Sequence, residues 1–288
     1  MKVVVVGDVG LDVVAQHDEP IVYGGDSRAA VTVTGGGAGA NTALWLRDRG
    51  AETTLVARVG DDAGGRLLRH ELETAGVRCV FAVDPATATC CVVVLVDAKG
   101  QRTMLPDRGA NKRFCPDDVP TTCLEGADHL HLSGYVLLDP SSRAGGLAAL
   151  ARAKRMGLTT SVDPQAAALL TDPQAFLADV QGVDLLLPNA DELRALTGSS
   201  EPEAARQLLD TVGSVAVTFG LEGAAWIDGD GIVTAPAKSV PCVDSTGAGD
   251  AFNAGFLTAW LQGASPAVAL DHGAELGAKA VSRIGAQP

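Results

Sequence analysis

Short runs of β-branched residues alternate with longer segments of helical periodicity along most of the chain. This pattern predicts strands followed by helices, which together form a mostly parallel sheet covered on both faces. We therefore expect an α/β fold in a single domain, 1–288, with ligands bound at the carboxyl ends of the strands. The expected strands are 3–6, 53–59, 129–132, 158–162, 183–187 and 215–219, and the expected helices are 39–49, 63–75, 142–156, 191–196, 202–212, 248–261 and 266–282.

Two segments interrupt the alternation. Residues 13–34 carry a Gly-rich turn between extended runs, and residues 89–105 read as two strands around the turn-forming cluster 97–100, Asp-Ala-Lys-Gly. Antiparallel strands inserted into a parallel α/β chain form either a small separate sheet, which would act as a lid over the ligand site, or an extension at the edge of the main sheet. The residue pattern is equally consistent with both alternatives.

Composition and charge exclude several classes of partner. The 288 residues are 47% hydrophobic, which is enough for a large core. The net charge is −13 without a compensating run of Lys or Arg, so nucleic acid is not an expected partner. The six cysteines lack zinc-binding spacing. The first apolar run is too short for a signal peptide and no long apolar run follows, so we expect no membrane segment and a cytoplasmic protein.

A Gly-rich turn directly precedes an apolar helix at 244–256, with the sequence Asp-Ser-Thr-Gly-Ala-Gly-Asp-Ala-Phe-Asn-Ala-Gly-Phe. The backbone N–H groups expected to point outward at the helix N-terminus are those of Gly247, Ala248 and Gly249. They would bind an anion such as phosphate, and Asp250 beside them would suit a proton acceptor. In the alternative interpretation, Thr246 is an ordinary N-cap and Asp250 complements the helix dipole.

A second Gly-rich block, 35–43, opens the first long helix with Gly-Gly-Gly-Ala-Gly-Ala-Asn-Thr-Ala. It loosely fits a dinucleotide-binding fingerprint with an acidic pair, 61–62, about 20 residues further on. That fingerprint normally follows the first strand of its unit, whereas this block follows an irregular segment, so a dehydrogenase is the weaker alternative. In the other interpretation, Gly36 and Gly37 let a sugar ring approach the backbone, and the Asn41 amide binds hydroxyl groups.

Together, the two blocks resemble the signatures of the PfkB, or ribokinase-like, family of carbohydrate and nucleoside kinases. The resemblance implies a three-layer α/β/α sandwich with a mostly parallel central sheet, and it favours a β-sheet lid formed by 13–34 and 89–105. It also implies transfer of the γ-phosphoryl group of ATP to an alcohol, with Asp250 as general base and residues 247–249 as an anion hole. The residues implied to hold the acceptor are Asp12, Gly36, Gly37 and Asn41.

The same resemblance implies sites for the nucleotide and for metal ions. Asn189 and Glu192 match a motif whose Glu orients the hydrated Mg²⁺ on ATP, although the same spacing is a helix capping box worth about 1 kcal/mol, and both interpretations are compatible. The implied nucleotide-binding residues, which also fit a plain turn between strands, are Asn189, Thr218, Gly220, Glu222 and Gly223. The implied ligands of a monovalent cation, K⁺, are Asp244, Thr246, Ala280, Arg283 and Gly285.

Two departures from the family pattern narrow the range of expected acceptor compounds. Ala38 stands where several sugar kinases of the family carry Lys, and without that cation an acceptor that already bears phosphate is disfavoured. Gly10 stands where ribokinase has Asn, which weakens the case for ribose. We therefore expect a plain sugar or sugar acid. The alternatives are an adenosine-like or pseudouridine-like nucleoside and, from another class, a non-catalytic sugar- or nucleotide-binding sensor. The resemblance also implies a homodimer that forms through the lid.

Overall fold

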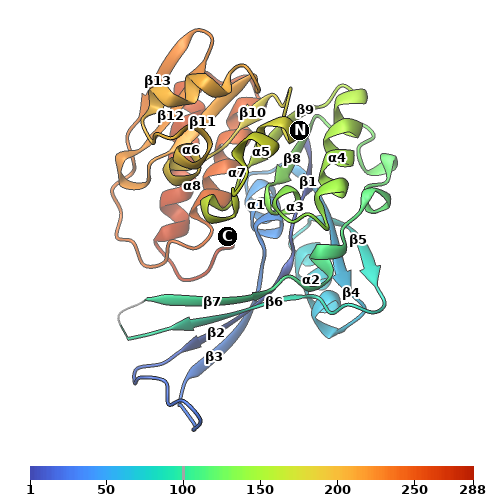
Figure 1. Cartoon of the computed structure of the whole chain (residues 1–288), viewed down its shortest axis with the longest axis vertical. Coiled ribbons are helices and arrows are strands. Elements are labelled where there is room, and N and C mark those ends of the chain that lie inside the picture. The colour runs from blue at the N-terminus through green and yellow to red at the C-terminus, as the bar shows by residue number, and fades with distance from the viewer. Residues whose placement is uncertain (99–100) are drawn as a thin grey trace.

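In the computed structural model, which describes residues 1–98 and 101–288, nine strands form the central sheet (Figure 1). Their order across the sheet is β13 (Gly231–Ala235), β12 (Ala224–Asp228), β11 (Ser214–Thr218), β10 (Leu185–Leu186), β9 (Thr159–Asp163), β8 (His129–Ser133), β1 (Lys2–Val6), β4 (Glu52–Gly60) and β5 (Arg78–Asp84). The strands from β11 to β5 run parallel, and β12 and β13 add an antiparallel edge. All the parallel strands therefore end at one edge, where ligands are expected.

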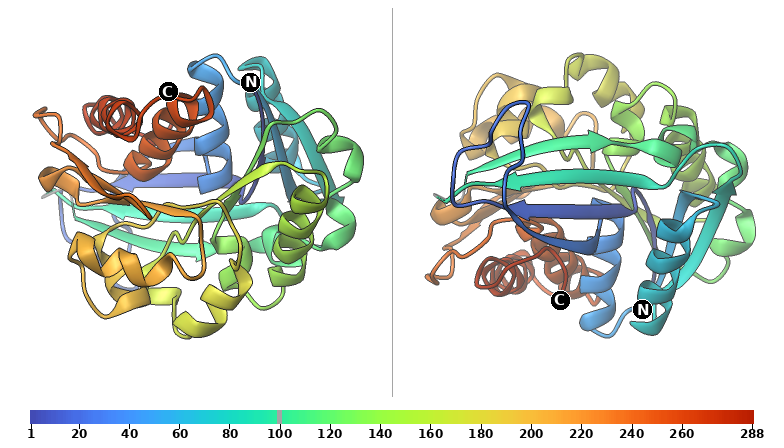
Figure 2. Two further views of the ribbon diagram at one scale, coloured as in Figure 1. Left: turned by 90° about the horizontal axis from the view of Figure 1, so that it is seen from above. Right: turned by 90° about the horizontal axis from the view of Figure 1, so that it is seen from below.

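Helices cover both faces of this sheet (Figure 2). One face carries α1 (Ala38–Asp48), α2 (Ala63–Thr74), α7 (Ala248–Leu261) and α8 (Pro266–Val281). The other carries α3 (Tyr135–Leu138), α4 (Arg143–Arg155), α5 (Pro173–Asp179) and α6 (Ala190–Thr197). In β1, Val3 and Val5 pack into the first cluster and Val4 and Val6 into the second, because successive side chains alternate between the two buried faces. The predicted three-layer α/β/α sandwich is confirmed.

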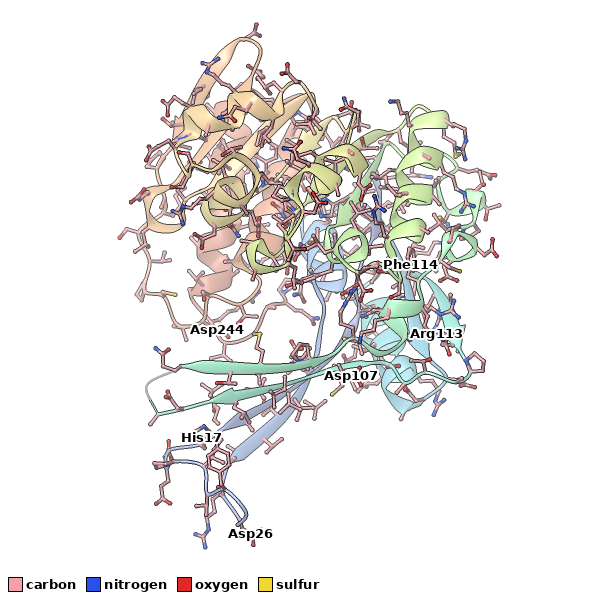
Figure 3. All side chains as sticks on the ribbon, in the orientation of Figure 1. His17, Asp26, Asp107, Arg113, Phe114 and Asp244 are labelled. Atoms are coloured by element: carbon pink, nitrogen blue, oxygen red, sulfur yellow. The ribbon has the colours of Figure 1, made fainter. Side chains whose placement is uncertain are left out.

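A second sheet of four strands projects from the main body (Figure 1). Its strands, in order, are β3 (Ala30–Gly36), β2 (Gly10–Gln16), β6 (Cys90–Val96) and β7 (Arg102–Asp107). It is separate from the main sheet, so the edge-extension alternative is wrong. The sheet is also mixed, because β2 pairs in parallel with β6. Figure 3 shows Asp107 where this sheet meets the body and Asp26 at its far end.

Two predicted elements are shorter than expected. The strand at 183–187 is only Leu185–Leu186, because the Asp184 carboxylate accepts from Thr160 N at 2.7 Å in place of a ladder bond and Pro188 follows. The helix at 202–212 is a 3₁₀ helix, Pro202–Leu208. Its buried residues Ala205 and Leu208 are three apart, which matches the 3₁₀ period.

Other elements lie outside the predicted set. These are the edge strands β5, β12 and β13 and the short helices α3 and α5. Asp12, which the resemblance implies holds the acceptor, lies within β2. Of the predicted turn at 97–100, residues 99 and 100 lie outside the described residues. No helix in the part of the chain that the structure describes is both long and apolar enough to cross a bilayer.

Two neutral histidines lie in the middle of the main sheet. His129 and His131 of β8 are both 0% exposed. The Ser161 hydroxyl of β9 lies 2.7 Å from His129 Nε2 and 2.8 Å from His131 Nδ1. Burial, with a further contribution from His131, lowers the pKa of His129 to about 3, and burial lowers the pKa of His131 to about 4. Both rings are therefore uncharged near neutral pH.

These histidines should make the fold sensitive to acid. Because their folded-state pKa is below the unfolded value, their contribution is complete above about pH 6.5 and is lost as pH falls toward 4, at up to about 1.4 kcal/mol per pH unit for each ring. We expect His131→Asn to reduce the difference in unfolding free energy between pH 7 and pH 5, measured by denaturant titration. His70→Asn, on the exposed surface of α2, is the control. Parallel pH curves for His131→Asn and wild type would contradict this prediction.

Candidate active site

The N-terminus of α7 begins in a turn that requires glycine. Gly247 is the N-cap with a φ of 71°, and a Cβ at this residue would lie 2.7 Å from the Cβ of Ala286. The alternative in which Thr246 caps the helix is wrong. The N–H and hydroxyl of Thr246 instead donate to Asp244 Oδ1, at 2.8 and 2.7 Å. The Ala248 N–H makes a long hydrogen bond to the Ser245 carbonyl, at 3.4 Å. The helix N-terminus and its dipole nevertheless suit an anion at this turn.

Asp250 lies on the first turn of α7 and is 8% exposed. Asn41 Nδ2 donates to its Oδ2 at 2.9 Å, and the Thr42 hydroxyl lies 3.5 Å from its Oδ1. Burial raises the pKa of Asp250 to about 6, while the hydrogen bond from Asn41 acts in the opposite direction. A carboxyl group with this pKa is ionised near pH 7 and still accepts a proton readily.

The amide of Asn41 is itself oriented by the C-terminal residues. Gln287 Nε2 donates to Asn41 Oδ1 at 3.3 Å, which leaves Nδ2 to face Asp250. One turn further along α1, the Trp45 indole N–H donates to the Ala286 carbonyl at 2.9 Å. The Asn41 amide therefore serves Asp250 in this structure, and its contact with sugar hydroxyls stays a prediction.

A cavity of about 210 Å³ lies against Asp250. Its walls include residues 247–250 and two further carboxylates, Asp163 and Glu192, and no Lys or Arg is present among its described lining residues. Asp163 Oδ2 accepts from Asn253 Nδ2 at 2.6 Å. Burial, followed by the charges of Glu192 and Asp250, raises the pKa of Asp163 well above its ordinary value. Three carboxylates without a cation suit a ligand that brings positive charge, although their side chains are not arranged to hold a metal ion by themselves.

Glu192 both caps α6 and faces this cavity. Its carboxylate accepts from Asn189 N at 2.9 Å and from Asn189 Nδ2 at 2.7 Å, and Asn189 Oδ1 accepts from the Glu192 N–H at 2.9 Å. The predicted capping box is therefore present. Glu192 is 2% exposed, and burial raises its pKa to about 7 against the effect of the hydrogen bonds from Asn189. Capping does not remove the carboxylate from the cavity wall.

A second cavity, of about 300 Å³, adjoins the first and shares Thr218, Ser245, Ala248 and Gly249 with it. Gly220 and Gly223 also line it, in the 3₁₀ turn between β11 and β12. The remaining wall is mostly small and apolar, as a flat nucleobase requires. Glu222, from the same predicted loop, is exposed and lines neither cavity.

On the other side of Asp250, β3 leads directly into α1. A Cβ at Gly36 would lie 2.3 Å from Asp12 Oδ2, so this carboxylate covers backbone that only glycine leaves open. Gly37 has a φ of 96°, and a Cβ there would lie 2.6 Å from the Asp8 carbonyl oxygen. Burial raises the pKa of Asp12 to about 6. The predicted acceptor residues are thus neighbours, with Asn41 linking them to Asp250.

One guanidinium lies near these residues. Arg108 Nη2 donates to both carboxylate oxygens of Asp8, at 3.1 and 3.0 Å, and its Nη1 donates to Asp139 Oδ2 at 2.8 Å. Its charge is therefore already matched by two carboxylates.

Comparison with known proteins identifies the chain. It matches the model of the pfkB family of carbohydrate kinases over residues 1–288. The chain belongs to this family. It is therefore an ATP-dependent carbohydrate kinase, as predicted, and the dehydrogenase alternative is wrong.

Individual relatives of this kinase differ in acceptor. An ATP-dependent ribose-1-phosphate kinase from Halopiger xanaduensis is 33% identical, over 100% of this chain and 94% of that protein. A fructokinase from Klebsiella pneumoniae is 34% identical, over 77% of this chain and 75% of that protein. A structure from E. coli in complex with ATP and Mg²⁺ is 25% identical, with a TM-score of 0.89 and coverage of 99% and 94%.

Sequence reasoning missed several residues of the kinase site. Asp163 directly follows a predicted strand, at the edge where ligands were expected, and that position could have identified it. Asn253 and Gln287 carry no such signal, because each acts through a partner distant in sequence: Asn253 binds Asp163, and Gln287 binds Asn41.

The predicted K⁺ ligands lie together at the end of the chain. Asp244 Oδ2 accepts from Gly285 N at 3.0 Å, which ties the loop before α7 to the C-terminal turn. The Arg283 guanidinium lies 5.0 Å from the Trp45 ring centre, and its Nη2 donates to the Gln287 carbonyl at 2.8 Å. The described residues contain no cluster of three or more His, Cys, Asp or Glu side chains arranged to hold a metal ion.

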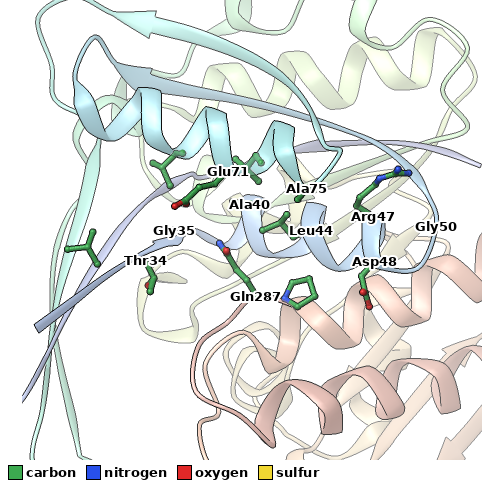
Figure 4. Close-up of a pocket in the computed structure, with 14 residues that line it drawn as sticks. Thr34, Gly35, Ala40, Leu44, Arg47, Asp48, Gly50, Glu71, Ala75 and Gln287 are labelled. Carbon is green, nitrogen blue, oxygen red and sulfur yellow. The ribbon is translucent and has the colours of Figure 1, made fainter. Parts of the chain in front are cut away.

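A larger cavity, of about 770 Å³, lies between α1, α2 and the C-terminal residues (Figure 4). Its wall includes Arg47, Glu71 and Gln287 but not Asp250. Its size does not make it the candidate active site, because Asp250, the N-terminus of α7 and the buried carboxylates lie around the smaller cavity.

Proposed function

We propose that this kinase phosphorylates a hydroxyl group of a small, unphosphorylated sugar or sugar acid, with Asp250 as general base. The observation that carries the proposal is the position of Asp250. The cavity of about 300 Å³ adjoins the one that Asp250 lines. Asn41 binds Asp250 and lies in the first turn of α1, next to the glycine turn where Gly36 lies against Asp12.

The chemistry follows from this placement. The acceptor oxygen attacks the γ-phosphorus of ATP while Asp250 takes its proton late in the transfer. Asn41 holds the carboxylate toward the acceptor, and the N–H groups of 247–249 stabilise charge on the phosphoryl oxygens. Positioning and electrostatics are sufficient, so no covalent enzyme intermediate is required.

Mg²⁺ suits the cavity that Asp163 and Glu192 line, because two buried carboxylates there lack a cationic side chain. Bound with ATP, the ion would neutralise phosphate charge while keeping several of its waters. Asn189 and Asn253 would hold the two carboxylates in place.

The charge around the acceptor residues disfavours an acceptor that carries the double negative charge of a phosphate. Asp8 and Asp139 already neutralise Arg108, and Asp12 adds a further carboxylate. Ala38 supplies no cation at the start of α1. A sugar phosphate is the second candidate, because a full-length relative is a ribose-1-phosphate kinase. A nucleoside is a further candidate acceptor, which activity assays distinguish from sugars and sugar phosphates. Because the chain is an ATP-dependent carbohydrate kinase, the non-catalytic sensor is no longer an alternative.

Three further expectations belong to the proposal. The carbonyls of Ala280, Arg283 and Gly285 lie beside the Asp244 loop and could supply oxygens to K⁺. The exposed apolar side chains of the second sheet, including Val31, are consistent with a homodimer through that sheet acting as a lid. The compartment is expected to be the cytoplasm.

Asp250→Asn should abolish phosphoryl transfer while leaving ATP and acceptor binding nearly intact. Loss of a general base costs roughly 100- to 10,000-fold in kcat. In wild type, kcat/KM should rise with pH through about 6, because burial raises the pKa of this base to about 6. ADP release measures turnover, and calorimetry measures binding. Near-normal turnover in Asp250→Asn would refute the assignment of Asp250 as the general base.

Glu192→Gln separates metal binding from helix capping. If the carboxylate orients Mg²⁺, the variant should need a higher Mg²⁺ concentration for half-maximal activity, with a smaller effect on thermal stability. Asp191→Asn removes a neighbouring exposed charge from the same helix turn and is the matched control. A lowered melting temperature with unchanged Mg²⁺ dependence would assign Glu192 to capping alone.

Asp12→Ala tests the acceptor site. It should raise the acceptor KM and leave the ATP KM unchanged, because a lost charge-assisted hydrogen bond costs about 1.5–3 kcal/mol. Asp26→Ala, at the far end of the same sheet, is the control (Figure 3). The acceptor is identified by measuring ADP release with a panel of sugars, sugar acids, sugar phosphates and nucleosides. Sugar phosphates as the best substrates would refute the proposal that the acceptor is unphosphorylated.

A further inference from the structure

The catalytic cavity is lined by three side-chain amides, and only two have partners for their nitrogen. Asn189 Nδ2 donates to Glu192 at 2.7 Å, and Asn253 Nδ2 donates to Asp163 at 2.6 Å. Gln165 Nε2 is buried, yet it has no hydrogen-bond partner within the described residues. A buried donor without a partner is costly, so its retention requires a reason.

The backbone of Gln165 is unusual in a second, independent way. Its φ is 74°, the one positive value at a non-glycine position among the described residues. This conformation is strained for a residue with a Cβ, and strain of this kind gathers at functional sites. The Gln165 N–H holds it by donating to Asp163 Oδ1 at 2.8 Å, just beyond the end of β9. The chain therefore keeps a long amide side chain where glycine would be relaxed.

The surroundings of this amide indicate what it would bind. Asp163, Glu192 and Asp250 act only as acceptors when ionised, and no Lys or Arg side chain is present in the described wall of the cavity. The Gln165 amide acts on Asp250 as a weak donor that lowers the pKa of this carboxyl, but the contact does not reach hydrogen-bond geometry, so Nε2 is left for a ligand. A donor at this place faces the point where the acceptor hydroxyl and the phosphoryl group would meet.

We propose that Gln165 is a catalytic residue whose Nε2 donates a hydrogen bond to a non-bridging oxygen of the γ-phosphoryl group during transfer. The inference rests on the proposed function. In this step the acceptor oxygen bonds to phosphorus, the bond from phosphorus to the β–γ bridging oxygen breaks, and the hydroxyl proton passes to Asp250. Gln165 keeps its protons and supplements the N–H groups of 247–249 in stabilising the transition state.

Gln165→Gly separates this role from a structural one, because it removes the amide and also relieves the positive φ. With the best acceptor from the panel, we expect kcat to fall about 100-fold, as for the loss of one preorganised donor. KM for ATP and for the acceptor should change by less than about threefold, and the melting temperature should not fall. Ala166→Gly loosens the same loop without touching the amide, and should retain wild-type kcat.

Gln165→Glu provides a second variant of nearly the same shape. Its ionised carboxylate cannot donate and would repel phosphate, so kcat should fall at least as far as in Gln165→Gly. A structural role predicts the opposite order, with the isosteric variant more active. A Gln165→Gly enzyme with kcat within about threefold of wild type, or with a raised KM alone, overturns the proposal.

Binding of Mg·ADP with and without aluminium fluoride distinguishes failure of this inference from failure of the proposed function. Aluminium fluoride mimics the phosphoryl group in transfer, so wild type should bind Mg·ADP more tightly in its presence. Gln165→Gly should lose most of that gain and bind Mg·ADP alone as wild type does. An undiminished gain in the variant refutes the role of Gln165 alone. Failure of the wild type to bind Mg·ADP refutes the proposed function and this inference with it.

Discussion

The hydrogen bond between Asn41 and Asp250 is the contact on which the rest of the site depends. It joins the first turns of α1 and α7, which are 209 residues apart in sequence but pack on the same face of the sheet. Burial against that face raises the pKa of the carboxyl group, and the amide limits the rise. The same bond connects the helix that follows one glycine turn to the helix that follows the other, and so brings the two glycine turns together.

The charges of the candidate active site suit a ligand that brings its own cations. Asp163, Glu192 and Asp250 are buried around one cavity, and burial raises the pKa of each. An isolated chain carries this as a cost to stability, since buried carboxylates lose hydration. In the proposed function, a nucleotide that arrives with Mg²⁺ would neutralise this cavity. His129 and His131, on the neighbouring strand β8, are instead kept neutral. Desolvation therefore raises the pKa of the buried carboxyl groups and lowers the pKa of the buried histidines.

Local sequence signals identified those parts of the candidate site that form through interactions between residues close together in the sequence. Gly247 and Asp250 occupy the start of a strongly apolar helix, and the Asn189–Glu192 spacing is sufficient to form a capping box. Short elements such as β10 and the 3₁₀ helix Pro202–Leu208 were predicted too long, because the periodicity of a few apolar residues does not report where hydrogen bonding changes. Gln165 was not predicted at all, since neither its backbone strain nor its unpartnered amide is visible in Asp-Pro-Gln.

The sequence by itself determined the α/β class, the glycine turns and the residue types able to bind phosphate and accept a proton, because these follow from periodicity and from bonds between near neighbours. Only the tertiary structure decided that the second sheet stands apart from the first, that Gln287 orients Asn41, and that Asn253 holds Asp163. These contacts join residues 246 and 90 positions apart, and their geometry depends on how whole helices pack on the sheet. Burial, and with it every shifted pKa in the site, arises only from that packing.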